Sequence, residues 1–100
     1  MLKVLLVEDE NLIRRGLQYK MDWTEVNCVV VGEAANGEEG IAQAEKCRPS
    51  LIITDLKMPK MDGLEMIAKL RERGCEAYVI ILTAYDSFTY AQTAIRLGAV

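Results

Sequence analysis

The segment that decides the fold is residues 51–63, which read Leu51-Ile52-Ile53-Thr54-Asp55-Leu56-Lys57-Met58-Pro59-Lys60-Met61-Asp62-Gly63. Its opening apolar run is typical of a strand that is buried on both faces. The run ends beside a lone carboxylate, Asp55, and a proline and a glycine follow within the segment. Open α/β sheets bind their ligands at the carboxyl ends of their strands. Asp55 is therefore a candidate nucleophile or metal ligand, or else a simple strand-end turn residue.

Apolar runs and helical patterns alternate along the rest of the chain. Strands are predicted at residues 3–7, 28–34, 51–53 and 77–82. Helices are predicted over residues 11–21 and after the N-cap residues Asn36, Asp62 and Asp86 or Ser87. The predicted apolar faces are Leu12, Ile13, Gly16 and Leu17 on the first helix and Leu64, Ile67, Ala68 and Leu70 on the third. This alternation predicts an α/β fold, with a doubly wound parallel sheet and helices on both faces.

Composition limits the kind of protein. The 100 residues suit one domain, 51% of them are apolar, and the net charge is −3. This balance gives no basic footprint for nucleic acid, and no apolar run is long enough to cross a membrane. An odd number of scattered cysteines suits a reducing cytoplasm. Histidine is absent, which excludes Ser-His-Asp and Cys-His catalysis and leaves acidic and hydroxyl chemistry with a hard metal.

Acidic residues lie where the predicted strands end. The strand at residues 3–7 runs directly into Glu8-Asp9-Glu10, which is either a solvated turn before a helix or a cation site. The third strand ends at Asp55 and the fourth at Thr83. Because the carboxyl ends of parallel strands share one edge of the sheet, these groups should converge. Carboxylates and backbone carbonyls gathered in this way suit Mg²⁺.

With these motifs the chain resembles a receiver domain of a two-component response regulator. The matching motifs are Val7-Glu8-Asp9-Glu10, residues 55–63, Leu82-Thr83-Ala84 and Leu97-Gly98-Ala99, in the family's order and spacing. The resemblance implies a flavodoxin-like fold with strand order 2-1-3-4-5. It also implies a sensor histidine kinase as partner and a cytoplasmic location.

The resemblance implies a role for each matching residue. Asp55 would be the phosphoacceptor, which takes its phosphoryl group from a phosphohistidine of the kinase. Asp9 would hold Mg²⁺ directly and Glu8 through water, and the backbone carbonyl of Lys57 would be a further ligand. Thr83 would be the switch hydroxyl, and the small Ala84 would leave room for the phosphoryl group. A domain of this kind phosphorylates and dephosphorylates itself and is not a turnover enzyme.

A finer resemblance concerns the output of the regulator. Gly16-Leu17 with Trp23, and residues 83–91, resemble receivers fused to an arabinose-regulator-type helix-turn-helix domain. Transcription would then be the output, and DNA would be bound only through a domain absent from this chain.

The chain departs from the family pattern at its end. The family continues into a fifth strand with an aromatic switch residue and a lysine, and then into a fifth helix, whereas this sequence stops at Val100. We expect an incomplete receiver domain over residues 1–100, with strand order 2-1-3-4 and without the fifth strand and helix. The uncovered fourth strand or fourth helix could then support self-association.

Other classes fit less well. A haloacid-dehalogenase-type phosphatase, which is Mg²⁺-dependent, wants a second aspartate two residues after Asp55, where Lys57 stands. A flavodoxin wants a phosphate-binding loop where Glu8-Asp9-Glu10 would repel phosphate. A degenerate receiver fold that serves as a non-phosphorylated interaction module is the runner-up.

Overall fold

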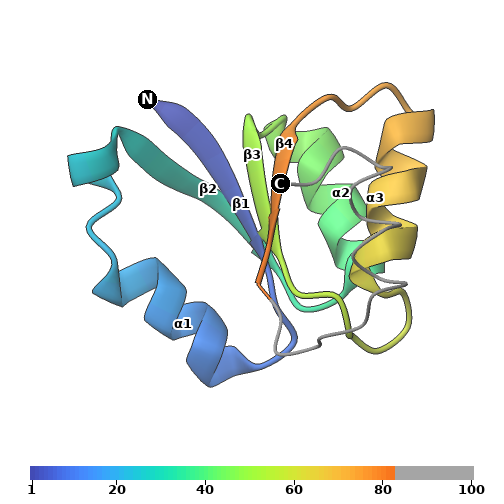
Figure 1. The fold of residues 1–100 in the computed structure, drawn as a ribbon, viewed down its shortest axis with the longest axis horizontal. Coiled ribbons are helices and arrows are strands. Elements are labelled where there is room, and N and C mark those ends of the chain that lie inside the picture. Colours follow the sequence, from blue (N-terminus) through green and yellow to red (C-terminus); the bar gives the residue numbers. More distant parts are fainter. Residues whose placement is uncertain (83–100) are drawn as a thin grey trace.

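A four-stranded parallel sheet forms the centre of the molecule (Figure 1). The computed structural model describes residues 1–82. In these the strand order is β2-β1-β3-β4, with bounds β1 Leu2–Val7, β2 Cys28–Ala34, β3 Leu51–Thr54 and β4 Tyr78–Ile81. The predicted doubly wound parallel sheet and its strand order 2-1-3-4 are confirmed.

The two faces of the sheet carry different helices. α2 (Gly37–Cys47) and α3 (Gly63–Glu72) cover one face, and α1 (Asn11–Lys20) lies on the other (Figure 1). A short 3₁₀ helix, η1 (Thr24–Val26), leads from α1 to β2. Because each helix follows a strand and returns to the start of the next, all strands point the same way.

Burial on both faces explains the continuous apolar runs of the central strands. In β1, Leu5 and Val7 point into the larger core under α2 and α3, whereas Val4 and Leu6 point into a smaller core on the α1 side. These four side chains are at most 1% exposed. Successive residues of a strand face opposite sides, so a strand covered on both sides has no polar alternation.

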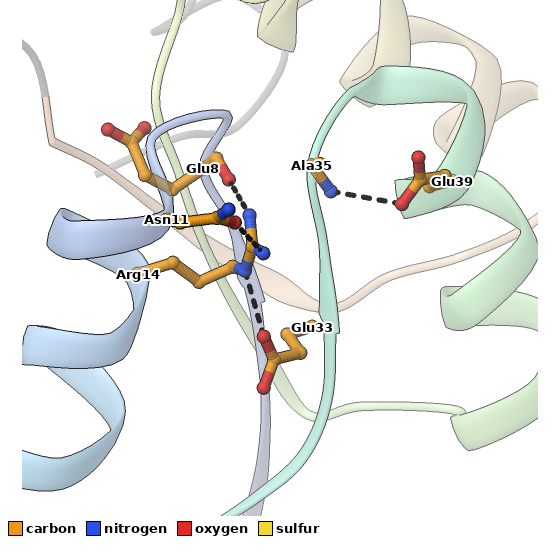
Figure 2. A network of polar contacts seen from close by, with 6 residues as sticks. All are labelled: Glu8, Asn11, Arg14, Glu33, Ala35 and Glu39. Atoms are coloured by element: carbon orange, nitrogen blue, oxygen red, sulfur yellow. Dashed lines mark hydrogen bonds and ion pairs between the residues drawn. The ribbon is translucent and has the colours of Figure 1, made fainter.

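Local capping fixes where α2 and α3 begin, as predicted. The Asn36 side chain accepts a hydrogen bond from the Glu39 amide at 2.9 Å, and Asp62 Oδ1 accepts one from the Glu65 amide, also at 2.9 Å. The Glu39 carboxylate reaches the Ala35 amide at 3.2 Å (Figure 2). These bonds satisfy amides that a helix start leaves without partners.

The apolar faces of two helices differ from the prediction. In α3 the buried residues are Gly63, Met66, Ile67 and Leu70, whereas the predicted Leu64 and Ala68 are only half-buried. The buried face of α3 is rotated about the helix axis relative to the predicted face, because α3 packs against α2 as well as against the sheet. In α1, Leu17 packs against the smaller core, but Leu12 is 87% exposed and Ile13 48%. The predicted fourth helix lies outside the described residues.

Candidate functional site

Strand register brings the acidic residues of β1 and β3 together. Val7 is level with Thr54, so the residues that follow each of them leave the sheet at the same edge. The Asp55 amide donates to the Val7 carbonyl at 3.1 Å. Carboxylate oxygens of Glu8, Asp9 and Asp55 lie within 4.8 Å of one another. The structure thus assembles the three carboxylates that the sequence placed at strand ends.

Glu8 is the most buried of these acids, with 6% of its surface exposed. Burial, a side-chain hydrogen bond to Asp55 and the charges of Asp55, Asp9 and Glu10 raise the pKa of Glu8 from 4.5 to about 7. Each of these causes disfavours a further negative charge. The cluster therefore favours either a shared proton or a bound cation.

The loop after β3 holds Asp55 in place. The Leu56 amide donates to Asp55 Oδ1 at 2.7 Å, and the Thr54 hydroxyl donates to the Asp55 carbonyl at 2.8 Å. The loop closes tightly at Gly63, whose amide donates to the Leu56 carbonyl at 2.8 Å. A Cβ atom at Gly63 would lie 2.3 Å from the Asp55 carbonyl oxygen. Only glycine allows this approach without a backbone shift.

Lys57 borders the cluster on two sides. It lines a cavity of about 400 Å³ together with Glu8 and Asp55, and this cavity is walled by apolar residues of α1 and of the strands. It also lines a shallower hollow of about 350 Å³ with Asp9 and Asp62. Lys57 therefore lies next to the three acids. Thr83 and Ala84 lie outside the described residues.

The sequence analysis missed a polar network beside the site. Arg14 of α1 donates from Nε to Glu33 Oε1 at 2.8 Å and from Nη1 to the Glu8 carbonyl at 2.6 Å (Figure 2). Its Nη2 donates to the Asn11 side chain. An arginine near the start of a helix, with a glutamate near the end of a strand, was the only available signal.

The donor set fits a hard divalent cation. All of its atoms are carboxylate oxygens, which Mg²⁺ prefers. Burial is the largest cause of the raised pKa of Glu8, and repulsion by the neighbouring carboxylates adds to it; a positive ion would relieve this repulsion. Fold and site together define a flavodoxin-like domain with an acidic strand edge suited to a hard divalent cation.

Comparison with known proteins identifies the family. The family model described as the response regulator receiver domain matches residues 4–100. This chain belongs to that family. The match sets aside the dehalogenase-type and flavodoxin interpretations, because the receiver match covers almost the whole chain.

Relatives and solved structures agree with this assignment. The chain is 36% identical over 98 residues to the uncharacterized transcriptional regulatory protein YesN of Bacillus subtilis. The aligned region covers 98% of this chain and 27% of YesN. It is 38% identical over 96 residues to the nitrate/nitrite response regulator NarL of Escherichia coli, covering 96% of this chain and 44% of NarL. The REC domain of AraT, a response regulator from Geobacillus stearothermophilus, superposes with a TM-score of 0.87 at 44% identity, covering 98% of this chain and 76% of that one.

The chain spans only part of its regulatory relatives. It covers 27% and 38% of the lengths of the first two curated matches. Among residues 1–82, no helix has the length and apolar character needed to span a membrane.

Proposed function

We propose that Asp55 accepts a phosphoryl group from a phosphohistidine of a sensor histidine kinase. An Asp55 carboxylate oxygen forms the new bond to phosphorus as the donor's phosphorus–nitrogen bond breaks. The imidazole leaves with the electron pair of that bond and takes up a proton. The observation that carries the proposal is the half-buried Asp55 carboxylate at a strand end, gathered with Glu8 and Asp9 within 4.8 Å. Phosphoryl transfer depends mainly on such positioning and on charge neutralisation.

We further propose that Mg²⁺ is held by Glu8, Asp9, Asp55 and the backbone carbonyl of Lys57. When bound, the ion neutralises the charge of the incoming phosphoryl group in an otherwise acidic pocket. The residues of the chain do the remaining work. The Leu56 amide orients the Asp55 carboxylate through its 2.7 Å hydrogen bond, and the Gly63 turn keeps the loop close to the sheet.

The consequences of phosphorylation are proposed from the family. The Thr83 hydroxyl would bind a phosphoryl oxygen and Ala84 would leave room for it, so the switch senses the new acceptor oxygens. The domain would act in the cytoplasm as a switch without turnover and would control transcription through a separate DNA-binding output domain. Self-association through β4 or the predicted fourth helix would be a further means of control.

The test is phosphorylation in solution. We expect incubation with Mg²⁺ and a small phosphodonor, followed by intact mass measurement, to show an adduct of about 80 Da, the mass of one phosphoryl group. Asp55→Asn should abolish the adduct, whereas Asp22→Asn, at an acid outside the cluster, should retain it. An unmodified wild-type chain would favour the non-phosphorylated interaction module instead.

The metal is tested separately through stability. An ion that binds only the folded state at ten times its Kd adds about 1.4 kcal/mol to the free energy of unfolding. For a domain of this size, Mg²⁺ should then raise Tm by roughly 5–10 °C. Asp9→Asn should remove most of this increase. A wild-type melting curve that is insensitive to millimolar Mg²⁺ would contradict the proposed metal site.

A further inference from the structure

Arg14 joins three separate parts of the chain. Its guanidinium donates to Glu33 on β2, to the Glu8 carbonyl at the end of β1, and to Asn11 at the start of α1 (Figure 2). The side chain is only 14% exposed, although α1 itself contributes no fully buried residue to the described part of the molecule. The planar fork of arginine suits several fixed partners at once.

The Glu8 backbone is consequently held from both sides. Its amide donates to the Ala34 carbonyl of β2 at 2.9 Å, and its carbonyl accepts from Arg14 at 2.6 Å. That carbonyl belongs to the planar peptide unit that joins Glu8 to Asp9. Fixing the plane restricts one backbone rotation of each residue, and these rotations direct the two carboxylates.

Charge neutralisation does not account for this arrangement. The Arg14 guanidinium forms its ion pair with Glu33, and its contact with Glu8 is to the carbonyl rather than to the carboxylate. When ionised, the carboxylates of Glu8, Asp9 and Asp55 repel one another, because their oxygens lie within 4.8 Å. The hydrogen bond from Arg14 to the Glu8 carbonyl opposes the movement apart of the carboxylates that this repulsion favours.

We propose that Arg14 is a positioning residue for the cation site, acting through the Glu8 carbonyl to keep the acidic pair convergent with Asp55. The inference rests on the metal binding proposed above. Groups that orient metal ligands typically contribute 10- to 100-fold to affinity. Glu33 supports Arg14 in turn, by pairing with its Nε.

Charge and positioning predict opposite changes in Mg²⁺ affinity when Arg14 is replaced by a neutral residue. Arg14→Met removes a positive charge next to an acidic site, and by charge alone it would tighten Mg²⁺ binding. Loss of positioning predicts the reverse, so we expect the Mg²⁺ affinity of the hundred-residue chain, measured by calorimetry, to fall about tenfold. Arg15→Met makes the same charge change at the exposed neighbouring position, and it should leave affinity unchanged or slightly tighter.

Two more variants separate position from folding. Arg14→Lys keeps the charge without the planar fork, so any loss of Mg²⁺ affinity in it reports positioning rather than charge, and we expect it to restore affinity only in part. It decides the matter if circular dichroism shows that Arg14→Met is unfolded. Glu33→Gln keeps the volume but removes a negative charge, so charge and loss of support both predict weaker binding there, by less than in Arg14→Met. A folded Arg14→Met with wild-type or tighter Mg²⁺ binding, or an unfolded Arg14→Met together with wild-type binding in Arg14→Lys, would overturn the inference.

A metal-free measurement keeps this inference distinct from the proposed function. We expect the NMR signals of the Glu8 carbonyl carbon and the Asp9 amide to shift in Arg14→Met and not in Arg15→Met. A wild-type chain that binds no Mg²⁺ would refute the metal site, but the same spectra would still test whether Arg14 fixes the Glu8 backbone. Unshifted Glu8 and Asp9 signals in Arg14→Met would refute that role of Arg14.

Discussion

Among residues 1–82, Glu8 is the residue at which burial and charge conflict most strongly. It is 6% exposed, it lies beside Asp9 and Asp55, and its pKa is raised to about 7. A buried carboxylate without a counter-ion is costly, so in the absence of metal the cluster holds a proton that solvent-exposed glutamates release at lower pH. The same conflict makes the site receptive to a divalent cation.

This shift predicts that stability falls as pH rises. Between pH 4.5 and about 7 the folded chain holds a proton on Glu8 that the unfolded chain has released, so the free energy of unfolding decreases with pH. The stabilisation is complete below the unfolded pKa and is lost as pH rises through the folded pKa. At 1.36 kcal/mol per pKa unit, the total loss is up to about 3 kcal/mol. Urea denaturation in EDTA at pH 5, 6, 7 and 8 measures it.

Glu8→Gln provides the comparison for this prediction. The amide stays neutral, so its stability should be nearly independent of pH over this range, whereas Glu72→Gln, at an exposed acid, should keep the wild-type slope. The chain has no histidine, the side chain that usually dominates titration there. Equal slopes in wild type and Glu8→Gln would show that Glu8 is ionised well below pH 7.

At the scale of elements, the turn from β3 to α3 connects the acidic site to the core. Asp55 begins the turn, and Gly63, the first residue of α3, packs against the Asp55 carbonyl. Asp62 caps the same helix. A helix that starts in contact with the Asp55 backbone leaves Asp55 little freedom to move alone.

Gly63→Ala should disturb the site through this contact. The new Cβ would lie 2.3 Å from the Asp55 carbonyl oxygen, which is backbone and yields only if the loop shifts. We expect a loss of about 1–3 kcal/mol in the free energy of unfolding, as for overpacked cores, together with weaker Mg²⁺ binding. Urea denaturation and calorimetry measure the two effects.

Gly16→Ala is the matched control for Gly63→Ala. A Cβ atom there meets nothing within 4 Å, and alanine in a helix interior is favoured over glycine by roughly 0.5–1 kcal/mol. It should therefore stabilise the chain and leave Mg²⁺ binding unchanged. A Gly63→Ala chain as stable as wild type would show that the loop adapts without cost.

At the scale of the whole molecule, the two faces of the sheet are unequally covered. The larger core lies under α2 and α3, and the smaller one lies on the α1 side. Both β2 and β4 are edges of the sheet in the described residues. β2 is interrupted by a register shift between its pairs with Val4 and Leu5, which protects an edge from further pairing. β4 contains neither proline nor lysine.

We expect the hundred-residue chain to self-associate through β4 or the helix predicted after it. Sedimentation should show concentration-dependent association. Tyr78, at the start of β4, is 72% exposed, and Tyr19 of α1 is 75% exposed. If β4 is the contact, Tyr78→Lys should weaken association by adding an edge charge, whereas Tyr19→Lys should not. A wild-type chain that stays monomeric at high concentration would contradict the prediction.

The amino-acid sequence by itself determined the parts of this protein that depend on neighbouring residues. The apolar runs of β1 and β3, the caps Asn36 and Asp62, and the acids directly after two strands are all local patterns. Parallel strand order then followed from the alternation of elements and from the family motifs. These features survive in the structure because local preference and tertiary packing agree at each of them.

Only the tertiary structure decided how far Glu8 is buried, which side of α3 faces the core, and that Arg14 reaches Glu33, 19 residues away in the chain. Each of these depends on strand register and on the rotation of a helix about its axis, and neither is encoded in a short window of sequence. A pKa shift, in particular, sums desolvation and charges from residues brought together by folding. The site's electrostatics therefore became visible only when Val7 and Thr54 were seen side by side.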